Sequence, residues 1–128
     1  MNIRWRQEDG QTLVEFALVL PVLALVLFGI IQFGLAFKDS LAVTDAVRAG
    51  ARQAAVSRLA ADPVARTRQA VLDASGDLDS SKVGVTVTST WQPGQDVTVT
   101  GTYPYRIDIL GLVVDSGNIT SSTTERVE

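Results

Sequence analysis

A single carboxylate, Glu15, interrupts an otherwise apolar stretch near the start of this 128-residue chain. Residues 12–37 contain that one charge and one amide, Gln32, but no lysine or arginine. A charge at the centre of a bilayer costs about 2.5–3.5 kcal/mol, so such a group either reaches the headgroups or finds a positive partner. Because the run offers no cationic side chain, a free α-amino group would serve as that partner.

An amine of this kind could be released by cleavage just before the apolar run. The leader, residues 1–10, reads MNIRWRQEDG; it is polar, carries two arginines and ends in Gly10. Cleavage after Gly10 would make Gln11 the first residue of the mature chain and Glu15 the fifth. A basic leader, a terminal glycine, a glutamate at mature position five and a long apolar helix together resemble the type IV prepilin (class III) signal.

The apolar run and its continuation resemble the TadE/TadF family of pilin-like proteins from tight-adherence pilus systems. The segments GQTLVEFALVLPVLALVLFGIIQFG (10–34) and TDAVRAGARQAA (44–55) carry this resemblance. It implies a TadE-like pilin or minor pseudopilin with a structural or assembly role in surface adhesion. It also implies that prepilin peptidase cleaves between Gly10 and Gln11. Glu15 is then expected to meet the terminal amine of an adjacent subunit, which would set the axial register.

The resemblance further implies where the protein acts and what it meets. The expected partners are prepilin peptidase, other pilin or pilin-like subunits, the membrane pilus assembly platform and the lipid bilayer. The expected location is the bacterial cytoplasmic (inner) membrane, crossed once with the C-terminal domain outside, followed by incorporation into a surface pilus. Charge alone does not set this orientation, because Arg4 and Arg6 flank one end of the run while Lys38, Arg48 and Arg52 flank the other.

Two other hypotheses are compatible with an apolar run of this kind. The first is an uncleaved, single-pass membrane protein whose small domain scaffolds a secretion or pilus assembly machine. The second is an exported soluble domain released by signal peptidase, for which residues 34–36 (Gly-Leu-Ala) form the best available cleavage site. The first residue of the mature chain, found by N-terminal peptide mapping, distinguishes the hypotheses.

The composition argues against enzymes and cofactor-binding proteins. The chain has no cysteine and no histidine, which removes thiolate chemistry and the most common general base and metal ligand. Its net charge of -3 gives no support for nucleic-acid binding. Asp73, Asp77 and Asp79 cluster, but the spacing lacks the glycine and closing glutamate of an EF-hand loop. We therefore expect no catalytic residue, no cofactor and no metal site.

The apolar run must form a helix that is long enough to cross a membrane. Over residues 12–37 such a helix measures about 39 Å, more than the ~30 Å hydrocarbon core. We place the transmembrane helix at 11–37, with a kink or local melting at Pro21. From 38 to 60 the helix should continue outward, with Lys38, Asp45, Arg48 and Arg52 on one stripe and Val43, Val47, Gly50 and Ala54 on the opposite stripe.

The remaining segments predict a small α+β domain at 38–128. Asp62 and Pro63 begin a short helix that reaches residue 74. Residues 83–127 predict an antiparallel sheet, since valines alternate with threonines on both sides of a Pro-Gly turn at 93–94. The run 107–114 could be strand or helix, and 119–127 reads as a polar edge strand. The fold class is a long N-terminal transmembrane or spine helix followed by a pilin-like antiparallel sheet.

Overall fold

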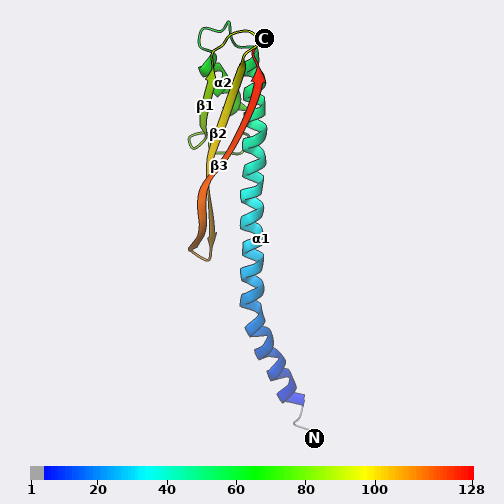
Figure 1. Ribbon diagram of the computed structural model, residues 1–128. Coiled ribbons are helices and arrows are strands. Elements are labelled where there is room, and N and C mark those ends of the chain that lie inside the picture. Colours follow the sequence, from blue (N-terminus) through cyan, green and yellow to red (C-terminus); the bar gives the residue numbers. More distant parts are fainter. Residues whose placement is uncertain (1–4) are drawn as a thin grey trace.

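The computed structural model describes the backbone of residues 5–128 and the side chains of residues 10–128; Arg4 and the start of the leader lie outside the described residues. A long helix, α1 (Trp5–Ala55), is followed by a short helix, α2 (Pro63–Asp73), and by three strands. The strands and α2 gather around the C-terminal end of α1, while the opposite end of α1 projects alone (Figure 1). The predicted α+β architecture is therefore confirmed.

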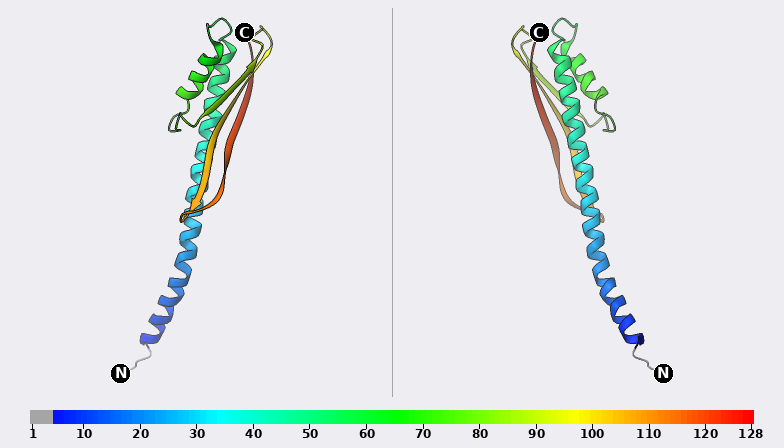
Figure 2. Two further views of the ribbon diagram at one scale, coloured as in Figure 1. Left: turned by 90° about the vertical axis from the view of Figure 1, so that its left-hand side faces the viewer. Right: turned by 90° about the vertical axis from the view of Figure 1, so that its right-hand side faces the viewer.

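Helix α1 runs without interruption through Pro21. A proline in a helix removes one backbone hydrogen bond and bends the axis. In Figures 1 and 2 the blue N-terminal part of α1 leans away from the axis of the rest. The backbone stays helical on both sides of the proline, so the helix is bent within its N-terminal part and not locally melted.

Helix α1 ends at Ala55, short of the end predicted at residue 60. The amide of Ser57 donates to the carbonyl of Ala54 at 3.0 Å, which tightens the last turn. The Ser57 hydroxyl also donates to the carbonyl of Gln53 at 2.5 Å. The amide of Glu128 donates to the carbonyl of Ala55 at 2.9 Å. These bonds satisfy carbonyls that a longer helix would have used, which is why the helix stops here.

The three strands form one antiparallel sheet in the order β1 (Gly84–Ser89), β2 (Asp96–Ile109), β3 (Leu112–Arg126). The predicted hairpin between the first two strands is confirmed. Strands β2 and β3 extend well past β1, and they descend beside α1 toward its N-terminal half (Figures 1 and 2). The ambiguous run 107–114 is the end of this long hairpin: two strand ends joined by the turn residues Leu110 and Gly111.

The core lies between the sheet, α2 and the C-terminal part of α1. It consists mainly of small residues from α1 and valines from the other elements: Val43, Ala46, Val47, Ala51, Ala54, Val71, Leu78, Val97, Val99 and Val127. Two glycines allow this close approach. A side chain on Gly50 would collide with Val71, and one on Gly101 would collide with Val47. The predicted apolar stripe of α1 is therefore the face that packs, and the predicted charged stripe is exposed.

Helix α2 begins as the sequence predicts. Asp62 lies at the N-cap, where its Oδ1 accepts a hydrogen bond from the amide of Ala65 at 2.9 Å, and Pro63 occupies the first turn. The helix ends at Asp73, with Ala74 as the C-cap. It buries Thr67 and Val71 against α1. Capping thus fixes the start of α2, and packing on α1 fixes its face.

Candidate functional site

Residues 12–37 of α1 present apolar side chains around the whole helix, interrupted by Glu15 and Gln32. The helical stretch Gly10–Ala55 is long and apolar enough to cross a membrane. No residue in its most apolar 18-residue part is buried within the protein. Large side chains such as Leu18 and Phe33 are more than half exposed. An apolar helix without a polar face is stable only in lipid or among other helices. This half of α1 therefore requires a surrounding that the chain itself does not supply.

The predicted site residues all lie on this projecting part of α1. Gly10 and Gln11 are adjacent helical residues, and the position that a side chain on Gly10 would take has open space within 4 Å. Gln11 Nε2 donates a hydrogen bond to Glu15 Oε1 at 3.1 Å, one turn along the helix. The structure thus places Gln11, the residue after the predicted cleavage point, one helical turn from Glu15.

Glu15 is paired with an amide and not with a cation among the described side chains. All ion pairs of the described residues lie at Lys38 or beyond. An amide compensates a carboxylate only in part, because a hydrogen bond to a neutral donor is weaker than one to a charged donor. The carboxylate therefore retains capacity for a positive partner on the exposed surface of α1.

Residues 10–52 match the family model described as TadE-like protein, over a third of the chain. The match begins at the predicted cleavage point, spans the apolar surface and ends within the packed part of α1. This segment is TadE-like. The match associates the chain with the tight-adherence pilus. Proteins of the TadE-like family are structural components of that pilus system. No curated protein and no solved structure matches the chain.

Outside the TadE-like segment, the aspartates near the end of α2 lie in separate interactions. Asp73 accepts a hydrogen bond from Gln69 at 2.7 Å, and Asp77 pairs with Lys38 at 3.2 Å. Among the described residues, no group of three or more side chains could hold a metal ion. Each carboxylate therefore serves a local contact of its own, and one of these contacts ties the domain to α1 through Lys38.

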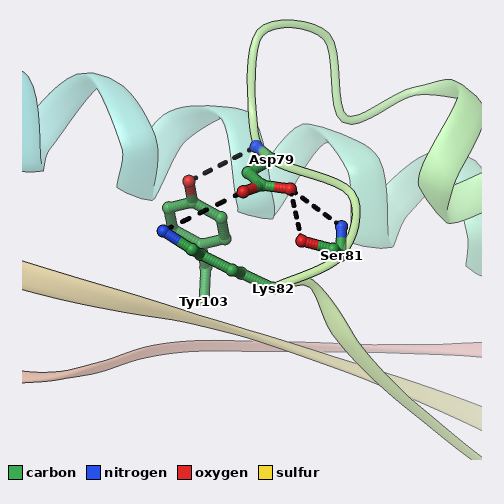
Figure 3. A network of polar contacts seen from close by, with 4 residues as sticks. All are labelled: Asp79, Ser81, Lys82 and Tyr103. Carbon is green, nitrogen blue, oxygen red and sulfur yellow. Dashed lines mark hydrogen bonds and ion pairs between the residues drawn. The ribbon is translucent and has the colours of Figure 1, made fainter.

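Asp79 organises the turn that leads into β1 (Figure 3). Its Oδ1 accepts hydrogen bonds from the Ser81 hydroxyl at 2.6 Å and the Ser81 amide at 3.0 Å, and its Oδ2 lies 3.9 Å from Lys82 Nζ. The Asp79 amide donates to the hydroxyl of Tyr103 on β2 at 3.3 Å. The hydrogen bonds from Ser81 lower the pKa of Asp79, with a smaller contribution from Lys82. These contacts hold the turn against the sheet.

The outer face of the sheet carries rows of hydroxyl groups. Thr86, Thr100 and Ser122 align across the strands in one row, and Thr88, Thr98 and Thr124 align in the next. Hydroxyls on β2 and β3 share hydrogen bonds, at 2.8 Å in the pair Thr98–Thr124 and at 3.1 Å in the pair Thr100–Ser122. The sequence predicts the alternation, but only the strand register shows that the threonines of three strands form one continuous polar face.

Sequence reasoning missed the position of the hairpin between β2 and β3. Its end lies beside the TadE-like helix, where Ile109 Cδ1 is 3.9 Å from the position that a side chain on Gly29 would take. Higher up, Tyr105 and Ile107 line an apolar hollow together with Phe33 and Phe37 of α1. The available signal was an apolar run, residues 107–114, around a Leu-Gly turn. Nothing local in that run indicates which part of α1 it reaches.

Proposed function

We propose that the protein is a pilin or minor pseudopilin of a tight-adherence pilus, held in the bacterial cytoplasmic membrane by residues 11–37 of α1 with the sheet domain outside. The observation that carries this proposal is the fully exposed apolar surface of α1, interrupted by the one carboxylate of Glu15, within the TadE-like match. Such a helix can sit first in lipid and later in a bundle of identical helices, since both surroundings are apolar.

Processing between Gly10 and Gln11 supplies the cation that Glu15 lacks. Prepilin peptidase hydrolyses this peptide bond, and the new α-amino group of Gln11 is protonated near neutral pH. Gln11 and Glu15 already lie one turn apart, joined by the 3.1 Å hydrogen bond. The amine and the carboxylate therefore occupy the same end of the mature helix.

Assembly then pairs the Glu15 carboxylate of one subunit with the Gln11 amine of its neighbour. In an apolar bundle an unpaired charge is costly, whereas a hydrogen-bonded ion pair of good geometry offsets much of that cost. Because amine and carboxylate are separated by one turn along α1, only one axial offset between neighbouring helices brings them together. The pair therefore fixes register more than it adds stability, and the role is structural and not catalytic.

The first test of this proposal follows the leader. Intact mass and N-terminal peptide mapping are performed on protein from membranes and from sheared surface material, in strains with and without prepilin peptidase. We expect a chain beginning at Gln11 only where the peptidase is present, and its recovery in the sheared fraction. A chain that keeps its leader in both strains and stays in membranes would instead support an uncleaved scaffold of the assembly machine.

The second test replaces the carboxylate. Glu15→Ala should leave insertion and cleavage intact but lower recovery in sheared filaments by an order of magnitude or more, because the amine then has no carboxylate partner and the axial register is lost. Gln32→Ala removes the one amide side chain of residues 12–37 and serves as the matched control. Filaments of normal yield from the Glu15→Ala variant would refute the register role.

A further inference from the structure

We propose that the end of the β2–β3 hairpin, residues 109–114 (the hairpin tip), inserts into the outer leaflet of the membrane as a second, non-spanning contact with lipid. The inference rests on the proposed membrane span of α1. It concerns a different element, which lies outside the TadE-like match.

The hairpin tip is the part of the sheet where large apolar side chains are exposed. Leu110 is 66% exposed and Leu112 is 74% exposed, and Val113 and Val114 are about half exposed or more. Elsewhere the sheet shows the opposite arrangement, with valines buried and hydroxyls outside. Exposed apolar side chains in a group mark a surface that binds another apolar surface.

The level of the hairpin tip along α1 places it in the membrane. Ile109 Cδ1 lies 3.9 Å from the position of a side chain on Gly29. If Glu15 marks one boundary of a ~30 Å hydrocarbon core, the other boundary lies about 20 residues further along, near Leu35. Gly29 is then about 9 Å inside that boundary. The hairpin tip therefore lies beside the lipid-facing part of α1, and the ribbon of the hairpin ends next to α1 (Figure 2).

The charged side chains and the turn amide close to the hairpin tip are compensated within the hairpin. Arg106 Nη2 lies 3.3 Å from Asp108 Oδ2, and Asp108 Oδ1 accepts the amide of Gly111 at 2.9 Å. The Tyr105 hydroxyl donates to Asp115 Oδ2 at 2.9 Å, a bond that raises the pKa of Tyr105. A backbone turn and charges can approach lipid only when their partners are supplied by the protein. Tyrosine is also typical of the headgroup boundary.

Two irregularities present apolar side chains at the hairpin tip. Leu110 has a φ of 53°, in a two-residue turn whose first position normally holds Asn, Asp or Gly. Ile107 pairs with Asp115 and Asp108 pairs with Val113, so Val114 is the extra residue of a bulge. The chain thus keeps a leucine where a polar residue would suit the turn better, and Leu112, Val113 and Val114 around the bulge are all exposed.

The test measures depth in a bilayer on the full-length chain, which has no natural cysteine. Leu112→Cys, Leu23→Cys and Ser122→Cys are each labelled with a nitroxide and reconstituted in phosphatidylethanolamine–phosphatidylglycerol vesicles at low protein density. Power saturation compares collisions with oxygen, which favours lipid, and with a water-soluble nickel chelate. We expect an oxygen-to-nickel ratio at position 112 that is several-fold above that at 122 and approaches that at 23.

The three labels separate failure of the hairpin tip from failure of the span. A lipid-like ratio at 23 with an aqueous ratio at 112 would overturn the insertion of the hairpin tip and leave the proposed function intact. An aqueous ratio at 23 would overturn both. A label at 112 that is aqueous at low protein density and shielded from both reagents at high density would assign the hairpin tip to a second copy of the chain, which also overturns the proposal.

A substitution at the turn tests whether apolar side chains carry the insertion. Leu110→Asn creates the favoured Asn-Gly pair, so the hairpin should still form. Combined with the label at position 112, it should lower the oxygen-to-nickel ratio. Val56→Asn, a similar change at an exposed apolar residue just past the C-terminal end of α1, is the matched control and should leave the ratio unchanged. A ratio unaffected by Leu110→Asn would overturn the proposal.

Discussion

Helix α1 contains two segments that differ in the size and the burial of their apolar side chains. Residues 10–37 carry large side chains that remain exposed, and residues 42–55 carry small ones that are buried against the sheet and α2. The small residues let other elements approach the helix closely, as the glycine at 50 shows. The large residues provide surface for lipid or other helices, where no partner within the chain needs to fit. Side-chain size therefore indicates which surrounding each segment was built for.

The long β2–β3 hairpin is also divided into a packed part and an exposed apolar part, and each lies beside the corresponding segment of α1. Its upper part covers residues 42–55 of α1 with buried valines and carries the rows of hydroxyls outside. Its lower part lies beside the exposed half of α1 and presents the apolar hairpin tip. Two elements far apart in sequence thus change character together, which is expected if one boundary between water and lipid crosses both.

The largest effect should come from equal substitutions at two glycines of α1. Gly50→Leu should destabilise the domain by about 3 kcal/mol or more, because the added side chain collides with Val71 in a filled core. Gly34→Leu should have little effect on the domain, since its added side chain would start in open space. Urea unfolding in detergent micelles, followed by Trp91 fluorescence in a Trp5→Phe background, measures both. Equal losses of stability would contradict the division of α1.

A smaller effect is expected from shortening one valine in each segment. Val47 is 0% exposed and Val26 is 55% exposed. Val47→Ala should lower the free energy of unfolding of the domain by about 1–3 kcal/mol, because it leaves a cavity between α1 and Gly101. Val26→Ala should change it by less than about 0.5 kcal/mol. The same fluorescence measurement applies, and a comparable loss at Val26 would mean that the apolar half of α1 packs on the domain.

Removal of the α2 cap should cost about 1 kcal/mol. Asp62→Ala deletes the acceptor of the Ala65 amide, whereas Asp62→Asn keeps an oxygen in the same place and should retain most of the stability. Asp45→Ala is a control on the exposed stripe of α1, where a pair with Arg48 at 3.9 Å contributes little. If Asp62→Asn lost as much stability as Asp62→Ala, the charge and not the cap would be responsible.

The sequence predicted features that depend on local chemistry or on periodicity. The apolar run, the alternation of valine with threonine and the Asp62–Pro63 start of α2 each identified an element correctly. The end of α1 was wrong by several residues because hydrogen bonds from Ser57 and Glu128 terminate it, and Glu128 is distant in sequence. The position of the hairpin tip beside Gly29 depends on the lengths of two strands and a bulge. Neither the contact of Glu128 with Ala55 nor that of the hairpin tip with α1 produces a periodic pattern in the sequence.

The cleavage point between Gly10 and Gln11 and the role of Glu15 stay predictions from spacing and resemblance, and the family match begins at Gly10. What spacing could not supply was the neighbourhood of Glu15. The structure adds the hydrogen bond from Gln11, and the proposed amine partner belongs to another subunit. If a second copy of the chain supplies the partner, the structure of one chain shows Glu15 with an amide contact and, among the described side chains, without its cation.

The smallest expected effect is a loss of stability at low pH. It distinguishes the sheet domain from the exposed apolar half of α1. The hydrogen bonds from Ser81 lower the pKa of Asp79 in the folded protein, so its contribution to stability is present above the ordinary value of 3.8 and is lost as the pH falls through the lowered pKa. Asp79→Asn should therefore be less stable than the natural chain at neutral pH, and the difference should shrink below pH 3.8. Unfolding monitored by Trp91 fluorescence at several pH values measures it. Because Asp79 lies in the turn that leads into β1 and its contacts are with Ser81, Lys82 and Tyr103, not with residues 10–37, the same substitution should leave the nitroxide depth at position 23 unchanged at every pH. A depth that shifted with Asp79 would mean that the two halves of the molecule are coupled and not independent.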